Sequence, residues 1–376
     1  MSDNATVALV RCSAYTSGVE TAVERLLAHL GGMKAFVSKG QKVLIKPNLL
    51  TDRAPAQAVT THPEVLRAII RLVRKAGGQP MVGDSPASVT KLETVWEKTG
   101  MKTLCEEEET PLLNLEKGGS RTFEIDGLSV NISRPVLEAD VVINVPKVKT
   151  HVLTTLTGAV KNMYGAVPGY HKTHLHKMRP NPVNFGRLVA GIYDCVTPAL
   201  SIADGIVGME GSGPSGGAHI ALGFLAASPD AYALDVTLCR ILGIRMAVVP
   251  TLQAYVKSHA TAKGTGITLA GATVKDVSPG SFSAPHSLAR LIPAWLAKPL
   301  AKLVWIRPSF TDRCVFCGRC VEACPASALT SQKDERPVLN PRACIECCCC
   351  HEICPETAIE MTPSPFLRIV RRGKQP

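Results

Sequence analysis

Several features that reveal where a protein works are missing from this chain of 376 residues. No uninterrupted apolar run approaches the roughly 18 residues that a membrane-spanning helix needs, so the sequence predicts no transmembrane segment. The amino terminus carries Asp3 and lacks the basic and apolar stretches of a secretory signal. These absences predict a globular protein of the cytoplasm, where the scattered thiols Cys12, Cys105, Cys195 and Cys239 stay reduced.

Signals for nucleic-acid and nucleotide binding are also scarce. Aromatic residues make up only 5% of the chain, and the basic residues form no single stripe, so nucleic acid is not an expected partner. Neither a GxxxxGK[ST] loop nor a GxGxxG loop stands between a strand and a helix. The net charge of +11 nevertheless needs an explanation, because residues 1–310 carry 33 Lys/Arg against 23 Asp/Glu. This basic body predicts an anionic ligand or partner.

Cysteine is abundant in one short segment. Ten of the 14 cysteines lie between Cys314 and Cys354, and eight of them follow the spacing C-x2-C-x2-C-x3-C-P twice. This spacing is typical of a bacterial ferredoxin with two [4Fe–4S] clusters, in which the fourth cysteine of each run ligates the other cluster. The predicted ligand sets are Cys314, Cys317, Cys320 and Cys354 for cluster 1, and Cys344, Cys347, Cys350 and Cys324 for cluster 2.

Two points about this segment stay open. Zinc is the alternative metal, since Cys-x2-Cys pairs also bind zinc, although a zinc site needs no third cysteine at the same interval and no Cys-Pro. The second run also contains the extra thiols Cys348 and Cys349, which we expect to be non-ligands close to cluster 2. Spare thiols of this kind predict sensitivity to oxygen.

The rest of the chain alternates between strand-like and helix-like segments. The predicted strands are 7–10, 42–45, 80–83, 141–145, 200–203, 222–226 and 267–270, and the predicted helices are 19–30, 63–76, 184–196 and 231–242. This alternation predicts an α/β fold, with a layered body around a largely parallel sheet and a small C-terminal α+β ferredoxin-like domain. The expected divisions are a body at 1–280, a connector at 281–310, the ferredoxin domain at 311–362 and a loose basic tail at 363–376.

The connector has two interpretations. Its apolar and basic residues are typical of a segment that packs between two domains. The alternative is peripheral contact with a membrane surface through Trp295, Leu296, Leu303 and Trp305. Pro293 and Pro299 would break any long helix here, which favours the connector.

Polar residues gather where the predicted strands end. In open α/β sheets, ligands bind beyond the carboxyl ends of the strands, so these residues are expected to share one crevice. The predicted ligand-binding residues are Lys46, Asn48, Asp84, Asn162 and Asp204, and the predicted catalytic residues are Lys147, Lys149, His151 and Lys161. For the lysines taken singly, a solvated loop charge is the alternative, and for the two aspartates a cap or turn.

Two further segments are chemically suggestive. The stretch 170–177 holds His171, His174 and His176, which is a weak signal for a metal site, because on a helix His171 and His174 would share a face, whereas on a strand His174 and His176 would face opposite ways. The glycine-rich stretch 204–217 is interpreted as a loop whose backbone amides could approach an anion.

Taken together, the motifs resemble one family. KPN at 46–48, THPE at 61–64, GDSP at 83–86, PKVKTH at 146–151, LTGAVKNMYG at 156–165 and ADGIVGMEGSGP at 203–214 occur in the order seen in the DUF362 family. Its members are prokaryotic proteins without a settled activity, sometimes fused to a ferredoxin domain. The resemblance covers roughly residues 5–280 and implies that these segments form a shared site.

The sequence therefore predicts low-potential electron transfer through two [4Fe–4S] clusters, feeding a redox reaction on an anionic ligand in the body. In this hypothesis Lys147, Lys149 and Lys161 hold the anion, and His151 or a nearby histidine supplies a proton. The alternative is a non-enzymatic electron carrier that docks to a partner oxidoreductase. Cluster storage or delivery is a third hypothesis. Whether the chain is an enzyme stays open at this point.

Overall fold

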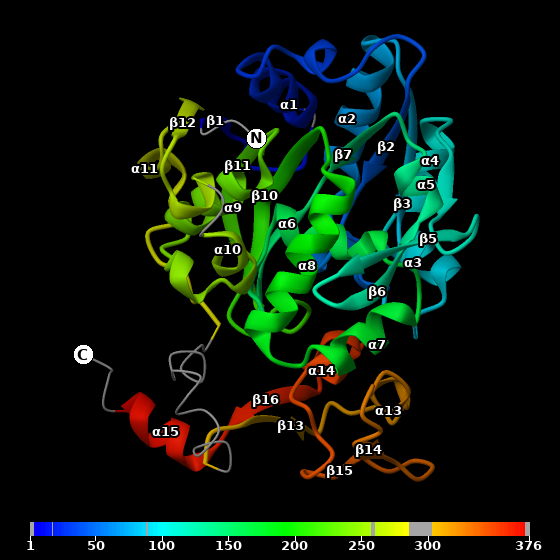
Figure 1. Ribbon diagram of the computed structural model, residues 1–376, viewed down its shortest axis with the longest axis vertical. Helices are drawn as coiled ribbons and strands as arrows, with labels where there is room; N and C mark the ends of the chain where they lie inside the picture. Colours follow the sequence, from blue (N-terminus) through cyan, green and yellow to red (C-terminus); the bar gives the residue numbers. More distant parts are fainter. Residues whose placement is uncertain (1–3, 17, 88, 257–259, 286–302, 373–376) are drawn as a thin grey trace.

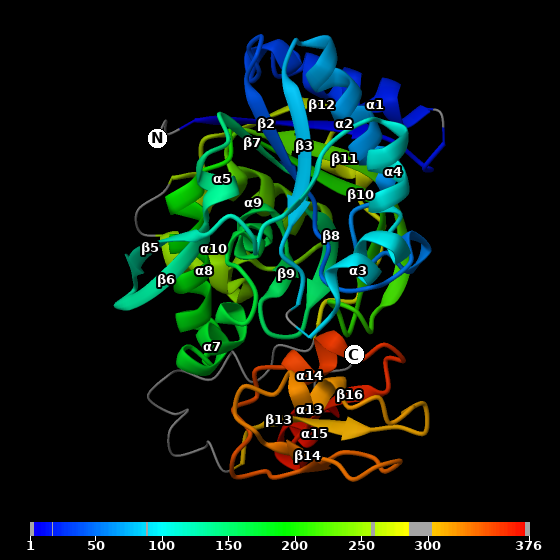
Figure 2. The same ribbon diagram turned by 90° about the vertical axis from the view of Figure 1, so that its right-hand side faces the viewer.

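The computed structural model describes residues 4–16, 18–87, 89–256, 260–285 and 303–372, and it consists of two parts (Figure 1). A large body is built around one twisted sheet. A small module that carries both cysteine runs lies against one end of the body, and Figure 2 shows its helix α14 (Cys349–Ile353) on the side that faces the body.

The body sheet has ten strands within the described residues. They are β1 (Ala5–Arg11), β2 (Lys42–Lys46), β3 (Gln79–Asp84), β4 (Leu112–Asn114), β7 (Val141–Asn144), β8 (Lys147–His151), β9 (Thr155–Thr157), β10 (Leu200–Glu210), β11 (Ala218–Ser228) and β12 (Ile267–Gly271). The spatial order is β12-β1-β11-β10-β7-β2-β3-β4, with β8 beside β10 and β9 beside β8. Only β11 and β9 run antiparallel to the strands that they pair with. The predicted largely parallel sheet is confirmed.

Helices cover both faces of this sheet. One face packs against α1 (Gly18–Ala28), α2 (Pro63–Lys75), α3 (Leu92–Lys98) and α4 (Met101–Glu107). The other packs against α6 (Ala159–Asn162), α8 (Pro182–Val196), α9 (Ala231–Ile241), α10 (Pro250–Tyr255) and α11 (Val274–Val277). Neighbouring residues of β2 divide between the two cores, Leu44 facing one and Ile45 the other, as the alternation of a strand requires. The predicted layered α/β body is confirmed.

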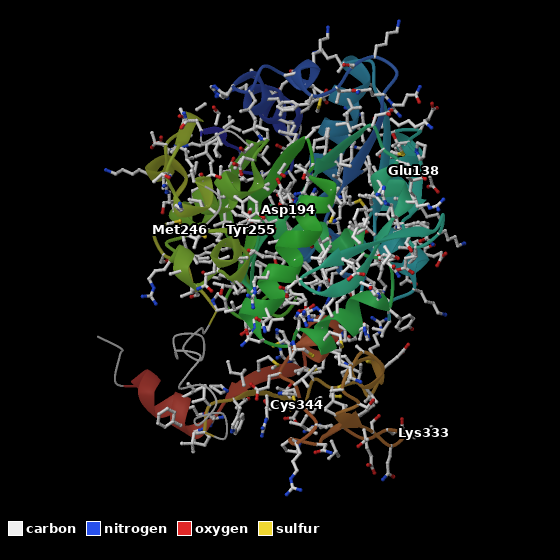
Figure 3. The ribbon with its side chains drawn as sticks, in the orientation of Figure 1. Glu138, Asp194, Met246, Tyr255, Lys333 and Cys344 are labelled. Carbon is white, nitrogen blue, oxygen red and sulfur yellow. The ribbon has the colours of Figure 1, made fainter. Side chains whose placement is uncertain are left out.

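A smaller group of elements extends the second layer. The hairpin of β5 (Ser120–Ile125) and β6 (Leu128–Ser133) leads into α5 (Arg134–Leu137), and α7 (His171–Met178) precedes α8. Phe185, Leu188 and Ile192 of α8 bury this hairpin and the end of α7. At the other end of α8, Asp194 accepts a hydrogen bond from Tyr255 of α10, and both residues are labelled in Figure 3.

The module is a small α+β unit. Strand β13 (Ile306–Phe310) pairs antiparallel with β16 (Ile359–Pro363), and β14 (Leu329–Thr330) pairs with β15 (Val338–Leu339). Helix α13 (Arg319–Glu322) follows the first cysteine loop, α14 follows the second, and α15 (Pro365–Arg372) comes last. Cys344, labelled in Figure 3, lies in this module. The predicted C-terminal ferredoxin-like architecture is confirmed.

The structure places the edges of the module differently from the sequence expectation. Strand β13 begins at Ile306, inside the expected connector, because its pairing with β16 joins the start of the module to its last strand. The expected loose tail begins within β16 and continues as α15. Residues 286–302, with Trp295 and Leu296, lie outside the described residues. In the described part of the chain, no helix has both the length and the apolar character needed to cross a membrane.

Candidate redox site at the junction of body and module

Each predicted set of four cysteines lines one hollow of the module. Hollow 1 is lined by Cys314, Cys317, Cys320 and Cys354, and hollow 2 is lined by Cys324, Cys344, Cys347 and Cys350. Most of the other lining residues are apolar, among them Phe310 and Ile359 in hollow 1 and Leu329 and Met361 in hollow 2. Four thiols in an apolar hollow suit a [4Fe–4S] cubane, whose irons are each bound by one thiolate.

A single-metal arrangement is not found. In the described ranges, no three or more His, Cys, Asp or Glu side chains are close enough together to hold one metal ion. A zinc ion would need ligands about 2.0–2.3 Å away in a tetrahedron. The finding applies equally to the histidines of α7, where His171 and His174 stack at 6.1 Å between ring centroids.

Module and body are joined by buried polar contacts. Arg319 of α13 makes two bonds to the Asp52 carboxylate, at 2.8 and 3.3 Å, and Arg53 donates to the Cys354 carbonyl at 2.6 Å. Burial tends to raise the pKa of Asp52, but hydrogen bonds from Arg319 and Lys98 lower it. A bidentate pair with a nearly inaccessible carboxylate orients the module as well as attaching it.

The glycine-rich segment forms the other attachment. The structure contradicts its interpretation as an anion-binding loop, because 204–210 belong to strand β10. The remaining residues receive helix α14 instead. Ser215 donates to the carbonyls of His351 and Glu352, and the Ser212 carbonyl lies 2.8 Å from His351 Nε2. A Cβ at Gly216 would approach the His351 ring to 2.9 Å, so the close packing of α14 requires a residue without a side chain.

A cavity of about 100 Å³ lies between body and module, and we call it the junction cavity. The body lines it with Asn48, Leu50, Asp84, Ser85, Pro86, Ala87, Val89, Lys161, Asn162, Tyr164, Gly165, Lys172, Thr173 and His176, and the module lines it with Ala323, Cys349, Glu352 and Ile353. The wall is incomplete without the module. It combines an apolar side with a side rich in ionisable groups.

Lys161 lines the cavity with an ammonium group that is available to bind a ligand. Within the described residues its Nζ makes no hydrogen bond and no ion pair within 4 Å. Burial lowers the pKa of Lys161, while the charge of Glu352 acts in the opposite direction. Lys172, by contrast, already donates to the Ser85 carbonyl, the Ser85 hydroxyl and the Val167 carbonyl. Burial lowers the pKa of Lys172 to about 8.

Glu352 brings a carboxylate from the module into this basic surrounding. Its Oε1 lies 2.9 Å from His151 Nε2. His151 Nδ1 accepts from the backbone amides of Leu153 and Thr154, so the ring proton is on Nε2, the nitrogen that lies next to Glu352. Burial and the charge of Lys161 lower the pKa of His151 to about 3. Burial tends to raise the pKa of Glu352, but His151 and Lys161 bring it below its usual range.

His176 is a second ring that lines the cavity. Its side chain is only 6% exposed and stacks on Phe185 at 4.3 Å between ring centroids. Burial lowers the pKa of His176 to about 4, so the ring is neutral at pH 7. Its Nδ1 has no hydrogen-bond partner in the described part of the chain. An unpaired buried nitrogen costs free energy, and a ligand in the cavity could satisfy it.

Three comparisons place these features among known proteins. A model of the 4Fe-4S binding domain matches residues 310–330, which hold the first cysteine run, so the module is an iron–sulfur domain. A model described as "Domain of unknown function (DUF362)" matches residues 43–240, more than half of the chain. The chain belongs to the DUF362 family.

Relatives of this DUF362 protein add detail. It is 40% identical over 251 residues to the thylakoid-associated protein sll1697 of Synechocystis. The aligned residues cover 66% of the chain and 78% of that protein. Its fold is also similar to the lactate racemase apoprotein of Thermoanaerobacterium thermosaccharolyticum. That match has a TM-score of 0.41 and 14% identity, covering 65% of the chain and 57% of the racemase, so the chain spans little more than half of that structure.

Three DUF362 motifs meet at the cavity. KPN contributes Asn48, GDSP contributes Asp84, and LTGAVKNMYG contributes Lys161 and Asn162. Asn48 Nδ2 donates to Asn162 Oδ1 at 2.8 Å, and Asn162 Nδ2 donates to Asn144 Oδ1 at 2.8 Å. Lys46 lies behind them, 2.8 Å from Asp84, and does not line the cavity. The structure thus brings together four of the nine body residues that the sequence singled out.

The PKVKTH motif forms a separate buried row. Lys147, Lys149 and His151 project from the same face of β8, because alternate residues of a strand share a face. Lys147 bonds Asp204 at 2.9 Å and the Tyr15 hydroxyl at 2.6 Å, and Lys149 donates to the Val59 carbonyl. The expectation that Lys147, Lys149 and Asp204 hold a ligand in the cavity is not supported, since their polar groups are occupied inside the protein. His151 reaches the site only through Glu352.

The contribution of the module to the cavity was not expected from the sequence. Cys349 and Glu352 lie beside predicted cluster ligands, Ser85, Tyr164 and Lys172 come from segments noted for other residues, and His176 was noted as a possible metal ligand. The extra thiol in the cysteine run was the available signal for Cys349. A local pattern contains nothing that indicates docking between domains.

Proposed function

We propose that this DUF362 protein transfers single electrons through two [4Fe–4S] clusters to a small anionic ligand held in the junction cavity. Cys314, Cys317, Cys320 and Cys354 would hold cluster 1, and Cys344, Cys347, Cys350 and Cys324 would hold cluster 2. When bound, such clusters supply electrons one at a time at low potential. The observation that carries the proposal is a cavity that contains an unpaired lysine and shares its wall with the cysteine module.

The body residues have separate roles in this proposal. Lys161 binds the anion and stabilises negative charge that develops on it, because its ammonium is the cation left without a partner. Asn48 and Asn162 orient the polar wall through their amide chain. His176 offers its unpaired ring nitrogen to the ligand. His151 lies behind the cavity wall, 2.9 Å from the Glu352 carboxylate, and helps to hold that carboxylate in place.

Electrons would enter the protein through hollow 1. Cys317 is exposed there, next to Val315 at 56% and Phe316 at 45% exposure. An apolar patch around an accessible cluster ligand suits a redox partner protein that docks transiently. The same patch favours the second candidate function, a non-enzymatic carrier that passes electrons between two proteins. The two candidates differ in whether the junction cavity binds a small ligand.

The deciding experiment is native mass spectrometry with metal analysis on protein purified without oxygen. The proposal expects about eight irons per chain and binding of an added probe, inorganic phosphate or bicarbonate. Lys161→Gln should lose the probe and keep the iron, whereas exposed Lys275→Gln, the matched control, should keep both. Iron without probe binding in the wild type would favour the carrier. About four irons would contradict the two-cluster assignment.

A further inference from the structure

Three asparagine side chains form an amide chain that ends at the junction cavity. Asn144 Nδ2 donates to the Ala159 carbonyl at 2.9 Å. Asn162 Nδ2 donates to Asn144 Oδ1, and Asn48 Nδ2 donates to Asn162 Oδ1, each at 2.8 Å. Asn144 is fully buried, whereas Asn162 and Asn48 line the cavity. The amide chain thus runs from a backbone carbonyl inside the body to the cavity wall.

The backbone fixes the direction of this amide chain. A carbonyl oxygen can only accept a hydrogen bond, so Asn144 turns its NH2 group toward Ala159 and its oxygen toward Asn162. Asn162 Nδ2 is held in the same way, because it also donates to the Pro47 carbonyl at 3.2 Å. Each asparagine therefore donates to the one before it. Asn48, the last of them, is left with its side-chain oxygen as the free end.

The free end is an acceptor without a donor. Asn48 Oδ1 is buried and has no hydrogen-bond partner within the part of the chain that the structure describes. Buried acceptors are normally paired, so a bound ligand is the natural source of the missing donor. Glu352 adds a carboxylate, which is a further acceptor, to the same wall. The wall therefore presents the unpaired ammonium of Lys161 together with oxygen acceptors.

We propose that the junction cavity selects small anions that carry a hydrogen-bond donor of their own, such as hydrogen phosphate or bicarbonate, over anions that can only accept. The inference rests on the proposed function and specifies its class of ligand. The negative oxygen would bind the Lys161 ammonium, and the O–H group would donate to Asn48 Oδ1. An anion without a proton would place lone pairs against the Asn48 oxygen and the Glu352 carboxylate, which disfavours it. The cavity of about 100 Å³ limits the ligand to a few non-hydrogen atoms.

The test compares two pairs of anions that share a shape and differ in a proton. Hydrogen phosphate and sulfate are both tetrahedral, and bicarbonate and nitrate are both planar. Only the first member of each pair carries an O–H group at neutral pH. Titration calorimetry on wild-type protein purified without oxygen should show that the first member binds about tenfold more tightly, because the second leaves a buried acceptor unpaired.

Variants assign the preference to particular residues. Asn48→Leu has a similar volume and no acceptor, so it should bind phosphate and sulfate with nearly equal affinity. Asn184→Leu, the matched control, changes an asparagine that does not line the cavity and should keep the wild-type preference. Lys161→Gln should lose all four anions, because it removes the cation that both members of a pair require.

The outcomes separate this inference from the proposed function. Equal affinities within both pairs in the wild type would overturn the selection and leave the proposed function standing. A preference that survives in Asn48→Leu would overturn the role of Asn48. Failure of all four anions to bind would overturn the proposed function, and the inference with it. The wild-type comparison needs no variant, so it decides the selection even if Asn48→Leu does not fold.

Discussion

The two cysteine repeats share one spacing but occupy different surroundings. The first repeat (residues 314–325) presents Val315, Phe316 and Cys317 to solvent. The second repeat (344–355) has Cys347 and Cys350 buried, and its helix α14 forms a wall of the junction cavity. The duplicated spacing thus predicts where iron would be held, while the residues between the predicted ligands decide what each hollow faces. One repeat suits an approaching protein, and the other suits an enclosed small ligand.

Removal of one ligand from each repeat should give the largest contrast. Cys347→Ala and Cys317→Ala should each reduce the iron content from about eight to about four atoms per chain. Cys347→Ala should also abolish phosphate binding, because Cys347 lines hollow 2 and precedes the cavity residue Cys349 by two positions, whereas Cys317→Ala should retain it. Metal analysis and binding measurements on both variants check this. Equal loss of binding in the two variants would contradict the division of roles.

Glu322 of α13 and Glu352 of α14 occupy equivalent positions in the two repeats and provide the next contrast. Glu352→Ala should destabilise the protein by about 2 kcal/mol, because it leaves Nε2 of the buried His151 ring without the carboxylate that lies 2.9 Å away. The equivalent Glu322→Ala should cost less than about 0.5 kcal/mol, since Glu322 is exposed and, within the described residues, accepts a single hydrogen bond, from the Tyr170 hydroxyl. Denaturant unfolding of the iron-loaded proteins measures both values. A similar cost for the two would show that the second repeat is not specially docked.

Acid should weaken the side of the body that faces the second repeat. The pKa of His176 is lowered to about 4 and that of His151 to about 3. A depressed pKa means that the unfolded chain binds the proton first, so their contribution to stability is complete above about pH 6.5 and is lost as the pH falls toward 4. Unfolding temperatures measured between pH 7.5 and 5 should fall less steeply in His176→Gln than in the wild type. Exposed His219→Gln, as the control, should follow the wild type.

The smallest contrast concerns one backbone position. Gly318 has φ of 73° and Cys348, its equivalent, has φ of 66°, a left-handed conformation that disfavours side chains. Gly318→Ala should therefore destabilise the module by about 1 kcal/mol, although nothing lies within 4 Å of the added methyl group. The measurement is again denaturant unfolding. No change on substitution would mean that the first loop adjusts its backbone freely.

The features that could be predicted from the sequence are those whose pattern lies within a short segment of the chain. The ligand cysteines and the alternation of strands and helices are local patterns, and both led to the correct architecture. Asn48, Asp84, Lys161 and Asn162 were found because strand ends meet at one edge of a sheet. The other features depend on residues that are far away in the sequence, and they could not be predicted. Nothing local indicates that Lys147 and Lys149 are buried against Asp204 and a carbonyl, or that the helix of another domain completes the site.

Glu352 has a practical consequence for anyone who divides the protein into its two parts. A chain shortened before the module would leave Lys161 at an opened cavity, and His151 behind it, without the carboxylate of Glu352. This opened site, basic and without its carboxylate, would bind phosphate, sulfate or chloride from any buffer, whatever the intact protein binds. Ligand screens on the isolated body would then report compounds that bind this exposed site. In the full-length chain such an inhibitor would encounter Glu352 and the other module residues that complete the junction cavity.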